Sequence, residues 1–83
     1  MPKTQLTVYT RAGCHLCDAL LEELSLYCVN HPFEFQSIEI SGDASLEQLY
    51  GTKVPVVTHD KTTLCEYFLD TQAIEVYFDK TGN

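Results

Sequence analysis

Two cysteines separated by two residues, Cys14 and Cys17, narrow the range of folds open to this chain. They follow residues 6–9, whose apolar and polar side chains alternate as in a half-buried strand. A loop containing Gly13 comes next, and residues 14–28 then repeat apolar side chains at helical spacing, with Leu16 expected on the apolar face. The first cysteine is therefore predicted to lie at the N-terminus of a helix, directly after a strand.

The rest of the chain alternates short apolar runs with helical ones. Pro32 ends the first helix, because proline cannot continue one. Residues 33–40 alternate like a strand, and a slip in phase after Gln36 indicates a bulge or a change of buried face. Asp70 or Thr71 can cap a final helix, although the segment that follows is also good strand sequence. The remaining predicted elements are a short helix over 46–50 and a hairpin of strands over 54–58 and 63–67.

These elements predict an α/β fold with the order β-α-β-α-β-β-α. The first two strands are joined through a helix and should be parallel, with a right-handed crossover. The hairpin adds antiparallel strands, which gives a four-stranded mixed sheet flanked by helices. At 83 residues and 9.4 kDa, the chain has room for only one core, so residues 1–83 are expected to form a single domain.

Composition argues against several classes of function. Twelve acidic residues stand against five basic ones, for a net charge of −7. This balance disfavours nucleic acid, whose phosphates require clusters of cations, and anionic membrane surfaces. No apolar run approaches the roughly 20 residues needed to cross a bilayer, and the N-terminus lacks a secretory pattern. We therefore expect a cytoplasmic protein and, since no heptad repeat is visible, a monomer.

The predicted position of Cys14 has chemical consequences. The first N–H groups of a helix have no partner within the helix, and with the macrodipole they favour a negative charge nearby. Arg11 adds a positive charge on the same loop. Cys17 lies one turn later and is farther from those groups. We expect Cys14 to attack a disulfide as a thiolate and Cys17 to resolve the mixed disulfide that results.

The other cysteines and the intervening histidine have plainer interpretations. Cys28 lies about 16 Å beyond Cys17 on the same helix, too far for a disulfide, so we expect it in the core. Cys65 is compatible with the core or the surface, and the core is favoured. His15 either stabilises the Cys14 thiolate as a cation or is simply exposed, and both interpretations stay open. A zinc site would need a second pair of ligands at suitable spacing, so no metal is expected.

Residues 9–17 and 53–57 resemble the glutaredoxin-like branch of the thioredoxin superfamily. The Cys-His-Leu-Cys sequence is similar to that of a group of short bacterial glutaredoxin-like proteins, and the resemblance covers nearly the whole chain. It implies a thioredoxin fold and a thiol–disulfide oxidoreductase that exchanges disulfides through Cys14 and Cys17.

The resemblance also implies roles for residues outside the cysteine pair. Pro55 should be cis and face the cysteines, Val54 should offer its backbone to a bound thiol, and Arg11 should contact an acidic end of glutathione. Asp70 matches an aspartate that precedes the last helix, but residues 66–68 replace the family's glycine pair. Glutathione is therefore expected only as a weak co-substrate and no cofactor as a bound group. The implied partners are protein disulfides or glutathione, together with a thiol reductase.

Two other functions remain open at this stage. One is a metal-binding carrier, because small copper chaperones also place C-x-x-C after a first strand. Those proteins use a different element order and usually have a methionine where this chain has Ala12. The other is a thioredoxin-fold binding module whose cysteines regulate a partner. A redox titration with turnover on a disulfide would distinguish the enzyme from both.

Overall fold

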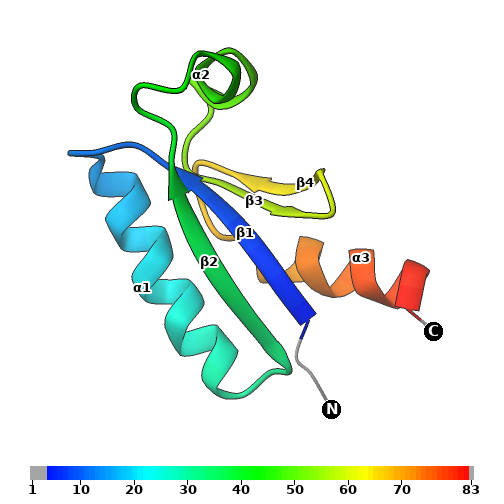
Figure 1. Cartoon of the computed structure of the whole chain (residues 1–83). Helices are drawn as coiled ribbons and strands as arrows, with labels where there is room; N and C mark the ends of the chain where they lie inside the picture. Colours follow the sequence, from blue (N-terminus) through cyan, green and yellow to red (C-terminus); the bar gives the residue numbers. More distant parts are fainter. Residues whose placement is uncertain (1–3, 83) are drawn as a thin grey trace.

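The computed structural model describes residues 4–82, with side chains to Asp79, and confirms the expected order of elements (Figure 1). The strands are β1 (Thr4–Thr10), β2 (Phe33–Glu39), β3 (Val56–His59) and β4 (Thr62–Glu66). The helices are α1 (His15–Val29), α2 (Ala44–Tyr50) and α3 (Thr71–Gly82).

The last segment is helical, as the capping pattern predicted. The side chain of Asp70 accepts a hydrogen bond from the N–H of Ala73 at 3.1 Å, so Asp70 rather than Thr71 makes the capping contact. Ile74 is fully buried and packs into the core from this helix. Capping and burial of one helical face together outweigh the strand propensity of the segment.

The four strands form one mixed sheet in the order β2-β1-β3-β4. β1 runs parallel to β2, and their pairing is unbroken from Thr4 opposite Phe33 to Thr10 opposite Glu39. β3 is antiparallel to both β1 and β4. The sheet therefore has the parallel crossover and the antiparallel hairpin that were predicted, with the cysteine loop leaving the end of a central strand.

The phase slip in β2 reflects a change of buried face, and the alternative of a bulge is wrong. Paired residues on neighbouring strands point to the same side of a sheet. Phe35 pairs with Leu6 and joins the main core, whereas Ile38 pairs with Tyr9, whose ring stacks on Tyr50 of α2. The two ends of β2 thus contribute to opposite faces. The irregularity in register lies instead in the pairing of β3 with β4, between Val57 and Thr58.

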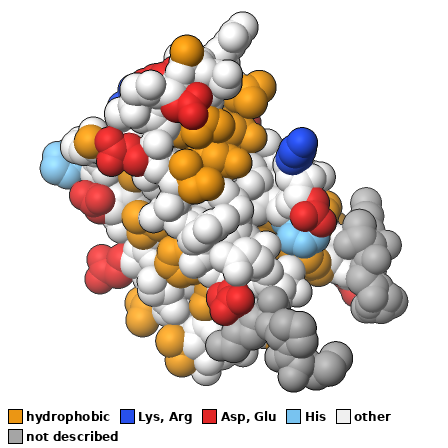
Figure 2. All heavy atoms as spheres, viewed as in Figure 1, with side chains coloured by type: hydrophobic (Ala, Val, Ile, Leu, Met, Phe, Trp, Pro, Cys, Tyr) orange, Lys and Arg blue, Asp and Glu red, His pale blue; other side chains and the backbone are white. Residues whose placement is uncertain are grey.

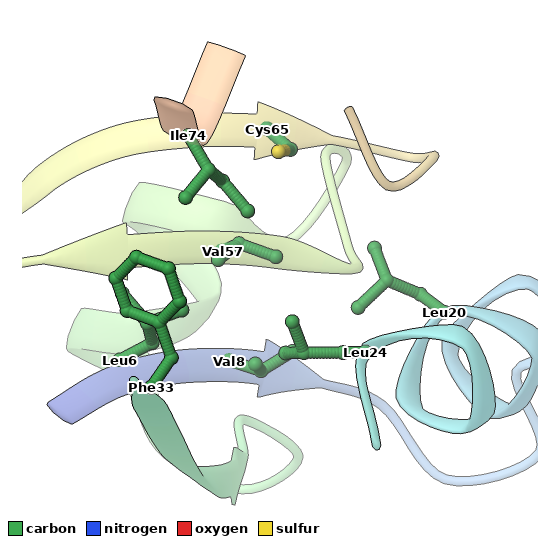
Figure 3. Packing of buried hydrophobic residues seen from close by; sticks show 8 residues of the cluster. All are labelled: Leu6, Val8, Leu20, Leu24, Phe33, Val57, Cys65 and Ile74. Atoms are coloured by element: carbon green, nitrogen blue, oxygen red, sulfur yellow. The ribbon is translucent and has the colours of Figure 1, made fainter. Parts of the chain in front are cut away.

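The main core lies between one face of the sheet and the helices α1 and α3 (Figure 3). Its buried members come from every strand and from both of these helices: Leu6, Val8, Leu20, Leu24, Phe33, Val57, Cys65 and Ile74. Burying an aliphatic side chain of this size contributes about 1.5–3 kcal/mol, so this layer fixes how α1 lies on the sheet. The position of the cysteine pair follows from that packing.

One prediction for α1 is corrected. Leu16 was expected on the apolar face, but it is 41% exposed, and Cys17 is buried in its place. At 100° per residue, Cys17 lies about 20° from Leu24 around the helix, whereas Leu16 lies about 80° away. Leu24 is fully buried, so it marks the centre of the contact with the sheet. Leu16 therefore falls at the edge of that contact and faces solvent.

Candidate active site

Cys14 is the N-cap residue of α1. Its backbone is extended, and its Sγ accepts a hydrogen bond from the N–H of Cys17 at 3.1 Å. Gly13, with φ of +73°, makes the turn that brings the chain from β1 into the helix, a conformation that glycine adopts readily. The sulfur thus occupies the place that a serine or aspartate oxygen usually takes at an N-cap. This N–H donor and the positive end of the helix favour negative charge on the sulfur.

Cys17 has the opposite environment. It is only 1% exposed, and burial raises the pKa of its thiol to about 11, with the contact to Cys14 adding to the increase. A thiol with such a pKa keeps its proton near neutral pH. The structure therefore gives the pair an asymmetry: one half-buried sulfur at a helix end and one buried, protonated thiol beneath it.

Arg11 is held by a residue that the sequence did not single out. Its Nη1 donates to Oε2 of Glu47 at 2.8 Å, and its Nη2 donates to Oε1 at 2.6 Å and to the carbonyl of Gly51 at 2.8 Å. The hydrogen bonds with Glu47 raise the pKa of Arg11, with charge on Glu47, Cys14 and Cys17 adding to the effect. The same hydrogen bonds with Arg11 lower the pKa of Glu47. No local pattern marks Glu47, because it lies 36 residues from Arg11 in the chain.

The Val54–Pro55 peptide bond is cis, as predicted. β3 begins at Val56 rather than at Val54, because proline lacks the N–H that a ladder needs. Val56 pairs with Tyr9 near the end of β1, and the two strands are antiparallel. Pro55 therefore lies beside the end of β1, where the cysteine loop starts. Pro55 is buried and Val54 is half-buried.

The segment before α3 was predicted to be a poor glutathione site because aromatic residues replace a glycine pair. Tyr67 has φ of +70°, a conformation more typical of glycine, and its hydroxyl donates to the carbonyl of Thr52 at 2.9 Å. Phe68 is 67% exposed. Asp70 is exposed and caps α3. The side chains of Tyr67 and Phe68 thus occupy the segment for which the family resemblance implies a glycine pair.

The other residues considered in the sequence, His15, Cys28 and Cys65, take no part in the site contacts described above. His15 is exposed on the first turn of α1. Cys65 is 5% exposed, which confirms it as a core residue, and Cys28 is half-buried against the core. Within the described part of the chain, no group of three or more metal-ligating side chains comes together. Among the same residues, no helix has the length and apolar character to traverse a bilayer.

Several large apolar side chains are exposed to solvent, both between the two cysteines and in later segments of the chain. Leu16 lies between the cysteines in sequence, Leu49 is on α2, and Tyr67 and Phe68 follow β4. Figure 2 shows hydrophobic side chains gathered below α2, with acidic side chains scattered singly around them. This face offers apolar contact area in acidic surroundings.

Known proteins show the same architecture. The family model "Glutaredoxin-like domain (DUF836)" matches residues 5–79. Protein Ne2328 from Nitrosomonas europaea is 38% identical, with a TM-score of 0.79 and coverage of 93% of this chain and 92% of that one. Protein XcR50 from X. campestris is 33% identical, with a TM-score of 0.70 and coverage of 90% of this chain and 96% of that one.

A more distant likeness identifies the fold. Thioredoxin 1 from Thermosipho africanus is 16% identical, with a TM-score of 0.63 over 95% of this chain and 99% of that one. At this identity the likeness concerns the fold alone. The expected thioredoxin-like α/β fold is confirmed by this match and by the order of the elements. No curated protein matches the sequence.

Proposed function

The chain belongs to the glutaredoxin-like domain family, and we propose that it is a thiol–disulfide oxidoreductase in which Cys14 attacks and Cys17 resolves. The asymmetry of the pair is the observation that carries the proposal. Cys14 Sγ lies at the N-terminus of α1 and accepts an N–H hydrogen bond, whereas Cys17 is buried with a pKa raised to about 11. Only the thiolate is a nucleophile, so one sulfur is prepared to attack and the other is held back.

The proposed reaction has two exchange steps. The Cys14 thiolate attacks one sulfur of a substrate disulfide, forms a mixed disulfide and releases the other half as a thiolate. Cys17 then loses its proton to the solvent or to the departing thiolate and attacks Cys14 Sγ. The second half of the substrate leaves as a thiol, and the protein keeps a Cys14–Cys17 disulfide. Two electrons have moved from the protein to the substrate.

The substrate and the reductant are part of the proposal. Protein disulfides fit the exposed apolar side chains Leu16, Tyr67 and Phe68, and glutathione is a weak co-substrate because the two aromatic rings obstruct the backbone near Asp70. A thiol reductase returns the oxidised pair to the dithiol form. We place this cycle in the cytoplasm, with the protein acting as a monomer and without a bound cofactor.

The test of the proposal is turnover on a small disulfide with a coupled reductase. Cys14→Ser should reduce the rate by at least about a hundredfold, because the nucleophile is gone. Cys17→Ser should retain the first step and accumulate a mixed disulfide visible by mass spectrometry. Cys28→Ser is the matched control and should turn over at the wild-type rate. Tight copper(I) or zinc binding by a reduced protein without turnover would contradict the proposal and favour a carrier.

The glutathione part is tested separately by NMR titration of the oxidised protein. We expect millimolar or unsaturable shifts, because each missing backbone contact costs about 1–3 kcal/mol of binding. Saturable shifts at Val54 and Asp70 with micromolar glutathione would show that Tyr67 and Phe68 do not obstruct the site.

A further inference from the structure

Arg11 is the cation closest in sequence to the cysteine pair, and a carboxylate of the protein already occupies it. Glu47 meets the guanidinium with both oxygens, at 2.6 and 2.8 Å, and Gly51 takes a further N–H through its carbonyl at 2.8 Å. The planar guanidinium fork matches a carboxylate in this two-point fashion. Any other carboxylate that approached Arg11 in the same way would have to displace Glu47.

The arrangement is built into the fold. Glu47 lies on α2, and Gly51 is the residue that follows this helix. A side chain at position 51 would press against the backbone carbonyl of Glu47, and its Cβ would lie 3.1 Å from Glu47 Oε1. Because Gly51 has no side chain, the carboxylate of Glu47 and the carbonyl of Gly51 can both accept hydrogen bonds from the Arg11 guanidinium.

The ion pair is also within reach of a substrate. Arg11 and Glu47 side chains are 36% and 35% exposed, so the pair is neither sealed in the core nor fully solvated. The guanidinium lies close enough to Cys14 and Cys17 to interact electrostatically with both. Groups attached to a disulfide that reaches Cys14 Sγ therefore enter the same electrostatic field.

We propose that Glu47 is a specificity-determining residue that occupies the carboxylate-binding position of Arg11 and so disfavours anionic disulfides relative to neutral and cationic ones. The inference rests on the proposed oxidoreductase activity. With Glu47 in place, Arg11 presents little unpaired positive charge, and the protein as a whole carries −7. Without Glu47, the guanidinium would attract a substrate carboxylate beside Cys14.

The experiment compares three small disulfides that differ in charge: dithiodipropionate as the dianion, hydroxyethyl disulfide as the neutral compound and cystamine as the dication. The reduced protein is mixed with each, and the second-order rate of protein thiol oxidation is measured. Each disulfide takes two electrons from Cys14 and Cys17 and leaves as two thiols. The rate of each variant is divided by the wild-type rate for the same disulfide, so the leaving groups cancel.

Glu47→Gln should raise the relative rate for the dianion about two- to fivefold over that for the neutral disulfide, as expected for a partly exposed ion pair. Arg11→Gln leaves the Glu47 carboxylate unpaired and should change the ratio in the opposite direction by a similar factor. Both shifts in the ratio of relative rates should be smaller at high salt, because salt screens exposed charges. Opposite shifts from two substitutions at one contact would not arise from a general loss of structure.

Glu34→Gln is the matched control. It removes one exposed negative charge from the start of β2, opposite Gln5 and therefore toward the far end of the sheet from the cysteine loop. Its rate for the dianionic disulfide, divided by its rate for the neutral one, should equal the same ratio in the wild type. If Glu47→Gln and Arg11→Gln also leave the ratio at the control value while hydroxyethyl disulfide is still reduced, the inference is wrong. If the wild type does not reduce hydroxyethyl disulfide through Cys14, the proposed function fails first.

Discussion

Cys14 and Cys65 both accept a hydrogen bond from a backbone N–H beside the start of a helix, yet their surroundings differ. Cys14 Sγ accepts from Cys17 at 3.1 Å and is half-buried at the end of α1. Cys65 Sγ accepts from the N–H of Asp70 at 3.3 Å and lies 3.5 Å from the carbonyl of the same residue, to which its S–H donates. Cys65 is 5% exposed, and burial raises the pKa of its thiol.

The comparison shows that an N–H donor alone does not make a cysteine reactive. At Cys65 burial in the core disfavours the thiolate and outweighs the N–H of Asp70, which favours it, while the S–H donates to the carbonyl of the same residue. At Cys14 the donor is combined with the helix N-terminus and with access to solvent. Exchange requires a thiolate that a disulfide can reach, and in this protein the N–H donor, the helix N-terminus and partial exposure coincide at Cys14.

The largest expected contrast between these environments is in alkylation rate. At pH 7, a pKa of about 11 leaves about one Cys17 thiol in ten thousand ionised. Iodoacetamide should therefore label Cys14 at least about a hundredfold faster than Cys17 or Cys65, measured by mass spectrometry of timed digests. In the Cys14→Ser variant, Cys17 and Cys65 should still be labelled slowly, and neither should reach the rate at which Cys14 is labelled in the wild type. Comparable labelling of Cys14 and Cys65 in the folded protein would remove the distinction drawn above.

The next contrast is in stability at high pH. The pKa of Cys17 in the fold, about 11, is above its ordinary value of 9.0, so the unfolded chain loses this proton first. Its contribution to stability is complete below about pH 9 and falls as the pH rises toward 11, by at most about 3 kcal/mol. Urea unfolding between these pH values should show the decline.

Cys17→Ala isolates that contribution. The variant should lose much of the decline and keep a smaller one, because burial also raises the pKa of Tyr27 and Tyr50, as it does that of Cys65. The sign is the same for these hydroxyls, since each is more easily deprotonated in the unfolded chain. Identical pH slopes for the variant and the wild type would mean that Cys17 is solvated well enough to ionise normally.

The smallest effect concerns the loop that holds Cys65. Asp70→Ala removes the side-chain cap of α3 and should cost about 1 kcal/mol of unfolding free energy. Because Cys65 Sγ bonds to the backbone of Asp70, labelling of Cys65 should also accelerate, while labelling of Cys14 stays unchanged.

Asp43→Ala provides the comparison for that variant. Asp43 caps α2 by accepting the N–H of Leu46 at 3.1 Å, so its loss should cost a similar amount without loosening the Cys65 loop. The difference in Cys65 labelling between the two variants separates local opening from global destabilisation. Equal acceleration in both would show that Cys65 is protected only by overall stability.

Local patterns predicted a large part of the molecule. Alternation and helical spacing are properties of neighbouring residues, so they indicated the order of the elements and the place of Cys14 at a helix start. For Cys65 the core was favoured over the surface, and the structure confirms its burial. The cis bond before Pro55 came from family resemblance rather than from any periodicity, and the structure confirms it.

Other features depended on how distant segments pack. Leu16 and Cys17 are adjacent in sequence, and which of the two is buried depends on which side of α1 meets the sheet. The two buried faces of β2 became distinct only once α2 covered the face opposite the main core. The pairing of Arg11 with Glu47 joins residues 36 positions apart, and no sequence period links them. Such contacts arise when burial of the core fixes the elements in space, because the energy that aligns the segments comes from apolar packing rather than from the ion pair itself.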